Sequence, residues 1–239
     1  MKKKLKILIP VIALLALAGI FLAYCIPYYH AEGAPDFSAN EIVTITDGGN
    51  YYFYDGPGKD TALIFYPGAK VEAKAYETLM VGLAEDGTDC FLVKMPLHMA
   101  FFGEDRAEDI MAMYSYDTWL MGGHSLGGSM AALYTEDHED TVDGLVLLAS
   151  FSTADLSSDT DLSVISIYGT EDKVLKLPKY EKNKKNLPSD TSFEYIIEGG
   201  NHAGFAYYGP QKGDGTAAIS KEEQIKKTVE AIETRLNSR

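Results

Sequence analysis

The chain is poor in cysteine, with only Cys25 and Cys90 in 239 residues. Cys25 falls in a long apolar segment, and Cys90 opens a run with the composition of a buried strand. A disulfide framework is therefore not expected, and the sequence has no zinc-ligand spacing. We interpret Cys90 as a small apolar core residue. The sequence thus predicts neither a metal nor a cofactor.

Positive charge is also scarce. The chain has 21 basic and 35 acidic residues, a net charge of −14. Four of the lysines precede residue 7 and no acidic residue occurs before Glu32, so the remainder carries 17 basic and 35 acidic groups, a net of −18. A surface of that charge repels phosphates and anionic lipid headgroups, which excludes nucleic acid as an expected partner.

The long uncharged run lies at the N-terminus. Residues 7–26 contain no charged side chain, and 20 residues of helix span roughly 30 Å, the thickness of a bilayer core. The preceding lysines favour a cytoplasmic N-terminus. Residues 1–30 are therefore predicted to be a membrane anchor, a single transmembrane helix that leaves the domain outside the cytoplasm.

Two alternatives remain for this segment. A cleaved secretory signal has the same layout with a shorter apolar region, and cleavage after Gly33 would release a secreted domain. Lipidation of Cys25 is the other alternative, although Tyr24 stands where a small residue is expected.

After a polar linker at residues 31–40, hydrophobic patterning indicates a folded domain over residues 41–239. Strands are expected at 41–46, 51–54, 61–66, 90–94, 118–123, 144–149, 161–168 and 193–197. Helices are expected at 72–85, 105–114, 126–136, 179–186 and 221–236.

This alternation of strands and helices predicts an α/β fold, a mostly parallel β-sheet flanked by helices on both faces. Only eleven residues separate the strands at 144–149 and 161–168, which leaves no room there for a large lid domain. Ligands of such sheets bind at the carboxyl ends of the strands. The candidate catalytic residues all follow expected strands.

Residues 123–127 read GHSLG, a G-x-S-x-G motif between an expected strand and an expected helix. In this setting the serine lies on a tight, strained turn with its hydroxyl exposed. Side chains at Gly123 and Gly127 would collide with neighbouring segments. Ser125 is therefore the candidate nucleophile.

A serine hydroxyl needs a general base. Of the five histidines, His202 follows an expected strand, in the glycine-rich loop GGNHAG late in the chain, and is the candidate. The other four fit less well: His30 precedes the domain, His98 precedes the serine, His124 should point into the packing behind the turn, and His138 lies among acidic residues at a helix end.

The base in turn needs a carboxylate that fixes its tautomer. Asp172 follows the strand expected at 161–168 and is preferred over its neighbour Glu171. The chain order Ser125, Asp172, His202 is the order nucleophile, acid, base.

The hydrolysis of an acyl bond also needs two backbone N–H groups that bind the oxyanion. Leu126, directly after the serine, supplies one. The loop after the strand at 61–66 should supply the other, and Ala69 is the candidate because Pro67 has no N–H.

Five stretches together resemble the α/β-hydrolase superfamily, closest to small, lidless bacterial members related to the dienelactone hydrolases: FYPGAKVEAKAYETL, FLVKMP, GGHSLGG, YGTEDKV and GGNHAGFAYYGPQKGDG. The resemblance covers about residues 40–238. It implies the α/β-hydrolase fold, a triad of Ser125, Asp172 and His202, and an oxyanion hole at Ala69 and Leu126.

Two departures leave the substrate open. The dienelactone hydrolases proper use a cysteine nucleophile, whereas this chain has Ser125. Its oxyanion loop begins Tyr66-Pro67-Gly68 rather than with the His-Gly pair common in esterases. Residues 205–215, rich in aromatics and glycine, are expected to form one wall of the substrate pocket.

The sequence thus predicts a carboxylesterase-like serine hydrolase that cleaves a small-molecule ester or related acyl bond through an acyl-enzyme. Two alternatives keep the fold: a non-catalytic extracytoplasmic binding protein, and an acyltransferase for a cell-envelope acceptor. The oligomeric state stays open.

Overall fold

The computed structural model describes residues 2–38 and 40–238, and its centre is an eight-stranded sheet. The strands are β1 (Thr44–Asp47), β2 (Tyr51–Asp55), β3 (Thr61–Tyr66), β4 (Thr88–Val93), β5 (Thr118–His124), β6 (Gly144–Leu148), β7 (Ser163–Gly169) and β8 (Ser192–Ile197). Their order is β1-β2-β4-β3-β5-β6-β7-β8. The β1–β2 hairpin is antiparallel, as is the β2–β4 pair, and all later pairs are parallel.

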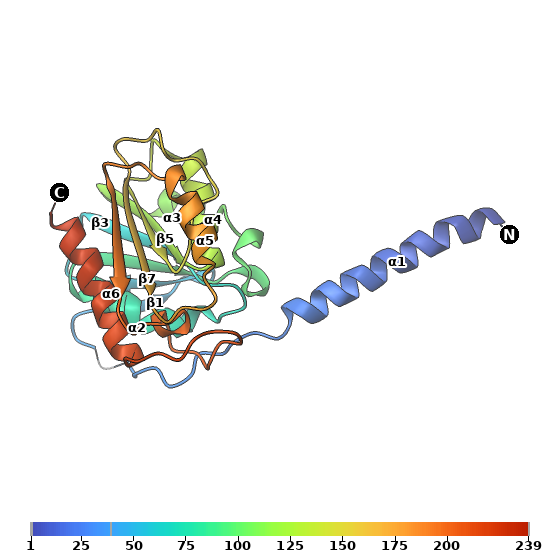
Figure 1. Cartoon of the computed structure of the whole chain (residues 1–239), viewed down its shortest axis with the longest axis horizontal. Coiled ribbons are helices and arrows are strands. Elements are labelled where there is room, and N and C mark those ends of the chain that lie inside the picture. Colours follow the sequence, from blue (N-terminus) through green and yellow to red (C-terminus); the bar gives the residue numbers. More distant parts are fainter. Residues whose placement is uncertain (1, 39, 239) are drawn as a thin grey trace.

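Helices cover both faces of this sheet, as predicted (Figure 1). They are α2 (Glu77–Glu85), α3 (Arg106–Met113), α4 (Leu126–Asp137), α5 (Leu177–Asn183) and α6 (Lys221–Leu236). One apolar core lies between the sheet and helices α2 and α6, and a second lies between the sheet and helices α3 and α4. Strands β4, β6 and β7 are buried throughout, which explains why most of their residues are apolar.

The connection from β6 to β7 contains only turns and bends. The expectation of a sheet without a large lid inserted there is therefore confirmed. The carboxyl ends of β3, β5, β7 and β8 consequently share one accessible edge of the sheet, which we call the catalytic edge.

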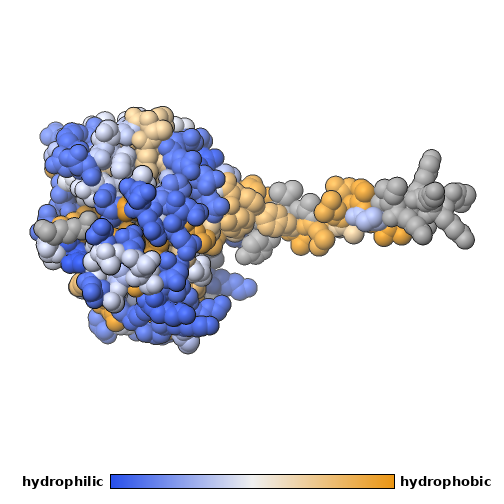
Figure 2. Space-filling view, turned by 90° about the horizontal axis from the view of Figure 1, so that it is seen from above, coloured by the Kyte–Doolittle hydropathy of each residue, from blue (hydrophilic) through white to orange (hydrophobic). Residues whose placement is uncertain are grey.

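The N-terminal helix α1 (Lys2–Cys25) projects away from the domain as a separate rod (Figure 1). Exposed apolar side chains such as Ile12, Leu14 and Leu15 give it an apolar surface (Figure 2). The lysines fall in its first turns, and Pro10 lies inside it. Within residues 2–38 and 40–238, however, no helix was found with both the length and the apolarity to cross a membrane. The predicted transmembrane helix therefore has no support in the structure.

The segment expected as a polar linker lies against the domain. Ala31 forms an isolated β-bridge with Tyr208, and Phe37 packs against the core that includes α2 and α6. The Asn40 side chain accepts the N–H groups of Ile42 and Val43, at 2.8 and 2.9 Å, and so caps the approach to β1. Residues 31–38 thus follow a defined path over the surface.

Candidate active site

Ser125 lies on the turn between β5 and α4, where it is the residue before the first turn of the helix. Its φ of 53° and ψ of −119° lie outside the regions that non-glycine residues favour, a strain of about 1–3 kcal/mol. A Cβ at Gly123 would lie 2.5 Å from the Gly127 carbonyl carbon, and one at Gly127 would collide with the carbonyl oxygen of Tyr66. The steric explanation for both motif glycines is therefore confirmed.

Two hydrogen bonds join this strained turn to the neighbouring strand β6 and the loop after it. The Ser125 N–H donates to the carbonyl of Leu148 at 2.9 Å, and the Ser150 hydroxyl donates to the carbonyl of Ser125 at 2.7 Å. Both partners belong to the end of β6 and the loop that follows it. The neighbouring strand thus fixes the backbone that presents the Ser125 hydroxyl.

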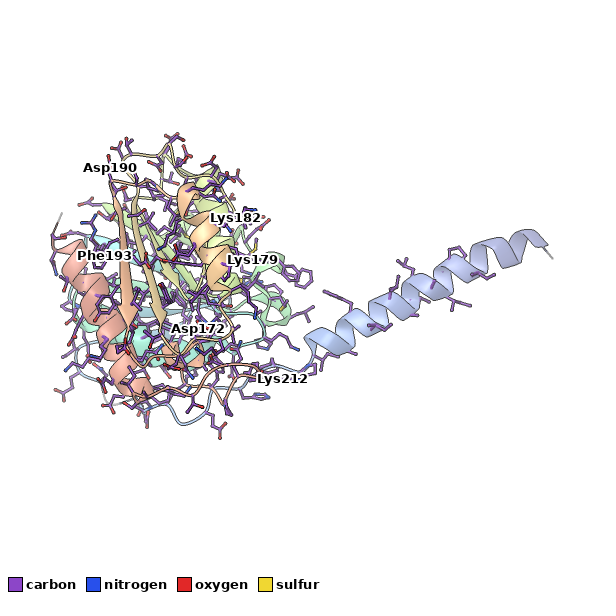
Figure 3. The ribbon with its side chains drawn as sticks, in the orientation of Figure 1. Asp172, Lys179, Lys182, Asp190, Phe193 and Lys212 are labelled. Atoms are coloured by element: carbon purple, nitrogen blue, oxygen red, sulfur yellow. The ribbon has the colours of Figure 1, made fainter. Side chains whose placement is uncertain are left out.

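Asp172 and His202 form a buried pair at the catalytic edge, where Figure 3 marks Asp172 just beyond the end of β7. His202 Nδ1 lies 2.8 Å from Asp172 Oδ2, and the two residues are 1% and 5% exposed. The other oxygen, Oδ1, accepts the N–H groups of Val174 and Leu175, both at 2.8 Å. The carboxylate is thus fixed in place, and it holds the histidine proton on Nδ1.

The other ring nitrogen of His202, Nε2, is unpaired: it is buried and has no hydrogen-bond partner among the described residues. The ring lies beside the serine turn, with its centroid 4.5 Å from that of His124. The structure therefore brings His202 to Asp172 and next to the turn, but it contains no hydrogen bond between Ser125 and His202. Catalytic hydrogen bonds of this type are often long without substrate.

The competing acid has other contacts. Glu171 Oε2 lies 4.0 Å from the ammonium of Lys173, and its side chain is 40% exposed. Of the two neighbouring carboxylates, the structure thus brings Asp172, and not Glu171, to the imidazole of His202.

The loop predicted to supply an oxyanion donor, residues 66–72 and called the oxyanion loop from here on, presents one unpaired N–H. The Gly68 N–H donates to the Tyr76 hydroxyl at 3.0 Å, and the Lys70 N–H donates to the carbonyl of His98 at 2.7 Å. Within the described part of the chain, the N–H of Ala69 between them has no acceptor, and neither has that of Leu126 at the start of α4. Because the Tyr66 carbonyl packs directly on Gly127, these two free donors lie on adjoining backbone segments.

Behind the serine turn lies a network that the sequence analysis did not find. The Tyr76 hydroxyl accepts the Gly68 N–H and lies 2.7 Å from His124 Nδ1. Its own hydrogen has no other acceptor among the described residues, so we assign it to Nδ1, which leaves His124 neutral. Burial lowers the pKa of His124 well below its usual value, and the charge of His202 acts in the same direction. His124 lies in the packing behind the turn, as predicted, and adds no second positive charge beside the base.

A second group missed in the sequence supports the base loop, residues 199–215. One oxygen of Asp214 accepts the N–H of His202 at 3.2 Å, and the other accepts that of Ala203 at 2.9 Å. The Lys173 N–H also points to Asp214, at 3.4 Å. Asp214 therefore joins the loop of the candidate base to the loop of the candidate acid. In the sequence it stands in Gly-Asp-Gly, which indicates only a turn.

Lys221, at the first position of α6, holds the same loop through its side chain. Its ammonium donates to the carbonyls of Ala203, Ala206 and Tyr208, at 3.1, 3.0 and 2.9 Å. These three bonds use all the hydrogens of the ammonium group. Because desolvation favours the neutral amine, burial lowers the pKa of Lys221 below its usual value.

Part of the segment expected to wall the substrate pocket lines a different hollow, whereas its first residue, Phe205, lies beside His124 with ring centroids 5.6 Å apart. Residues 208–211 and 214–217 line a hollow of about 630 Å³ together with Glu32, Asn201 and Lys221. Ser125 is not among its lining residues, so this hollow gives the predicted pocket wall no support. Among the described residues, no three His, Cys, Asp or Glu side chains are grouped so that they could hold a metal ion.

Comparisons with known proteins agree with this architecture. A model of the alpha/beta hydrolase family matches residues 62–226, more than half of the chain. No match was found among curated proteins. Similar solved structures include carboxyl esterase 2 of the mycorrhizal fungus Tuber melanosporum, with a TM-score of 0.62 at 12% identity, covering 88% of this chain and 91% of that one.

Two further structures share the fold. Est1E of Butyrivibrio proteoclasticus has a TM-score of 0.59 at 14% identity, covering 82% of this chain and 100% of its own. A predicted hydrolase of Thermoplasma acidophilum has a TM-score of 0.57 at 15% identity, covering 80% and 97%. The family match, the parallel sheet and the serine turn at the end of β5 lead to one conclusion: the chain belongs to the alpha/beta hydrolase family.

Proposed function

We propose that the chain is a serine hydrolase that cleaves a small-molecule ester or related acyl bond through an acyl-enzyme. One observation carries the proposal: the buried Asp172 holds His202 at Nδ1, and the ring of His202, with Nε2 unpaired, lies beside the strained turn of Ser125. An imidazole that is protonated at Nδ1 and unpaired at Nε2 can act as a general base. The hydroxyl of a neighbouring serine is the proton donor that such a base needs.

In the proposed reaction, the Ser125 oxygen attacks the carbonyl carbon while His202 Nε2 takes the hydroxyl proton. The oxyanion that forms is bound by the N–H groups of Ala69 and Leu126. His202 then gives its proton to the leaving alcohol as the C–O bond breaks, which leaves an acyl-serine. A water molecule repeats the sequence and releases the acid. Asp172 stays ionised and stabilises the imidazolium during both steps.

Two further observations support an ester substrate. Several similar structures are named esterases or serine hydrolases, and one of Est1E contains ferulic acid. Exposed apolar side chains also follow β4 on the loop that packs against α4, namely Leu97, Phe101 and Phe102. Such side chains suit an apolar acyl or alcohol group. The kinship with the dienelactone hydrolases, suggested by the sequence, belongs to the same proposal.

The test uses the full chain and a fluorophosphonate probe, with the adduct located by peptide mass spectrometry. Turnover of short-chain p-nitrophenyl esters is measured in parallel. We expect an adduct on Ser125, and we expect both labelling and turnover to be lost in Ser125→Ala and His202→Ala. His138→Ala is the matched control, because His138 stacks on Tyr134 at the far end of α4.

A folded chain with neither adduct nor turnover would instead favour a non-catalytic binding protein. An adduct with acyl transfer to an added alcohol or amine, at the expense of hydrolysis, would identify an acyltransferase.

The cellular location is a separate proposal. We propose that residues 1–30 direct the domain out of the cytoplasm, as the lysines before the apolar run suggest. Mass spectrometry of the N-terminus from fractionated cells would distinguish an intact segment, cleavage after Gly33 and a lipidated Cys25. Protection of the domain from external protease in intact cells with a permeable outer layer would contradict the proposal.

A further inference from the structure

We infer that residues 28–32, the N-terminal strap, are positioning residues that hold the oxyanion loop and the base loop in register with each other. The strap precedes the region matched by the family model, which begins at residue 62. The inference rests on the proposed function for its catalytic consequence. Its structural part, the holding of two loops by one segment, can be tested without any activity.

The strap pairs first with the oxyanion loop. The Tyr29 N–H donates to the carbonyl of Lys70 at 2.7 Å, and the Glu72 N–H donates to the carbonyl of Tyr29 at 2.9 Å. Tyr29 and Val71 thereby form a parallel β-bridge. The Ala31 N–H adds a hydrogen bond to the Glu72 carboxylate at 3.0 Å. These contacts begin one residue beyond Ala69, the proposed oxyanion donor.

The strap then pairs with the base loop. The Glu32 N–H donates to the carbonyl of Tyr207 at 2.9 Å, and Ala31 forms an antiparallel β-bridge with Tyr208. The Tyr29 ring lies 5.5 Å from that of Tyr208, and its hydroxyl accepts the Lys212 N–H at 3.2 Å. Figure 3 shows Lys212 close to the point where α1 joins the domain. The strap thus bridges residues 70–72 and residues 207–212, which are more than 130 positions apart in the sequence.

The oxyanion loop and the segment that contacts it both contain strained backbone. Lys70 in the loop has a φ of 61°, and Leu97 and His98 in the neighbouring segment have φ values of 52° and 56°, all in the left-handed region that favours glycine. Conformations of this kind cost about 1–3 kcal/mol each and persist only where surrounding contacts hold them. The Tyr28 ring stacks on the His98 ring at 3.8 Å, and the His98 carbonyl accepts the Lys70 N–H. The strap therefore covers the strained segments.

The catalytic consequence follows from the position of Ala69. If Lys70 relaxes, the N–H of the residue before it turns away from the oxyanion. Complete loss of one such donor costs about 10²–10³ in kcat, so a partial displacement should cost on the order of tenfold. Substrate binding in the ground state needs no oxyanion contact, so KM should change little. Any processing of the chain after Gly33 would remove the strap and reduce activity in the same way.

The test compares point variants of the full chain. Glu32→Pro removes the N–H that bonds to Tyr207, and Tyr29→Ala removes the ring and hydroxyl that contact the base loop. Ala34→Pro is the matched control for the first, because the Ala34 N–H makes no hydrogen bond among the described residues. Tyr29→Phe retains the ring and removes only the acceptor for the Lys212 N–H.

Three quantities are measured: amide hydrogen exchange of residues 66–72 and 203–212, kcat and KM for a short p-nitrophenyl ester, and affinity for a boronic acid that mimics the tetrahedral oxyanion. In Glu32→Pro and Tyr29→Ala we expect faster exchange in both loops, a fall of about tenfold in kcat and in boronate affinity, and a KM within about twofold. Ala34→Pro should resemble the unaltered chain, and Tyr29→Phe should lie between.

Unchanged exchange of both loops in Glu32→Pro and Tyr29→Ala would overturn the inference. So would faster exchange with unchanged kcat, since the loops would then not need the strap for catalysis. Absence of turnover and of boronate binding in the unaltered chain would contradict the proposed function instead, and the exchange data would still decide whether the strap holds the loops.

Discussion

The base loop and the oxyanion loop lie at the same edge of the sheet, but they are held in different ways. Asp214 and Lys221, both within the domain, fix the base loop through side-chain hydrogen bonds to its backbone. The oxyanion loop is held by the neutral Tyr76–His124 pair, whereas the strap pairs with the backbone of both loops. We therefore expect substitutions at Asp214 or Tyr76 to disturb one loop each, and substitutions in the strap to disturb both.

The largest effect is expected at the acid. Asp172→Asn keeps the shape of the side chain but presents the wrong hydrogen-bonding pattern to His202 Nδ1, so kcat should fall by on the order of 10⁴. Glu171→Gln, one residue away and paired with Lys173, is the control and should retain activity. Steady-state kinetics with a p-nitrophenyl ester measures both. Equal losses in the two variants would show that the carboxylate at His202 has no special role.

The next effect concerns the base loop. Asp214→Asn replaces one acceptor oxygen with an amide that opposes the N–H of Ala203 or His202. Because misplacement of a catalytic group by about 1 Å costs around 10² in rate, we expect kcat to fall 10- to 100-fold, with KM little changed. Asp190→Asn is the control, since Asp190 lies at the opposite end of the sheet (Figure 3). A loss confined to KM would contradict a positioning role.

A smaller effect is expected on the oxyanion side. Tyr76→Phe leaves the Gly68 N–H and His124 Nδ1 without their shared partner, at a cost of about 1–3 kcal/mol in stability. That corresponds to a fall in Tm of roughly 2–12 °C for a chain of this size. Boronate affinity and kcat should fall together, while the pH dependence of kcat keeps its shape because the His202–Asp172 pair is untouched. A shifted pH profile would mean that the two loops are coupled through the Tyr76 hydroxyl.

The smallest effect separates stability from catalysis. Glu233 on α6, hydrogen-bonded to Thr88, lies away from the catalytic edge, and burial raises its pKa to about 7, with the charge of Asp86 adding to the shift. The folded state therefore retains a proton that the unfolded state releases near pH 4.3. Its contribution to stability is present below pH 4.3 and is lost as the pH rises to about 7.

Thermal melts between pH 4.5 and 7.5 measure this contribution. Tm should fall less with rising pH in Glu233→Gln than in the unaltered chain, and kcat at pH 7 should be the same in both. Parallel melting curves across that range would show that Glu233 does not retain its proton in the folded state.

Local signals in the sequence were sufficient for most of the sheet. The apolar run at 61–66 is β3, and the helix expected at 221–236 is α6. Some boundaries moved: residues 73–76 form a 3-10 helix before α2, and β7 begins at Ser163 rather than at residue 161. Strand ends are set by the pairing partner, which a single sequence does not reveal.

Part of the candidate site could also be predicted from local signals in the sequence. The serine turn has a local steric signature, and Asp172 and His202 follow strands in the expected order. Asp214 and Tyr76 have no such signature, because their roles come from contacts with loops at a distance along the chain. The sequence predicts the end of an anchor and a linker where the structure has the strap, because the bridges of the strap to Val71 and Tyr208 arise only in three dimensions.

Gly127 has a consequence for how this enzyme can diverge. The Tyr66 carbonyl occupies the space that any side chain at position 127 would need, so at this point the serine turn and the oxyanion loop touch through backbone atoms. This contact does not depend on the identity of the neighbouring side chains. If the proposed function holds, we expect substitutions in the outer loops, such as the one carrying Phe101 and Phe102, to change substrate preference while this backbone contact is retained.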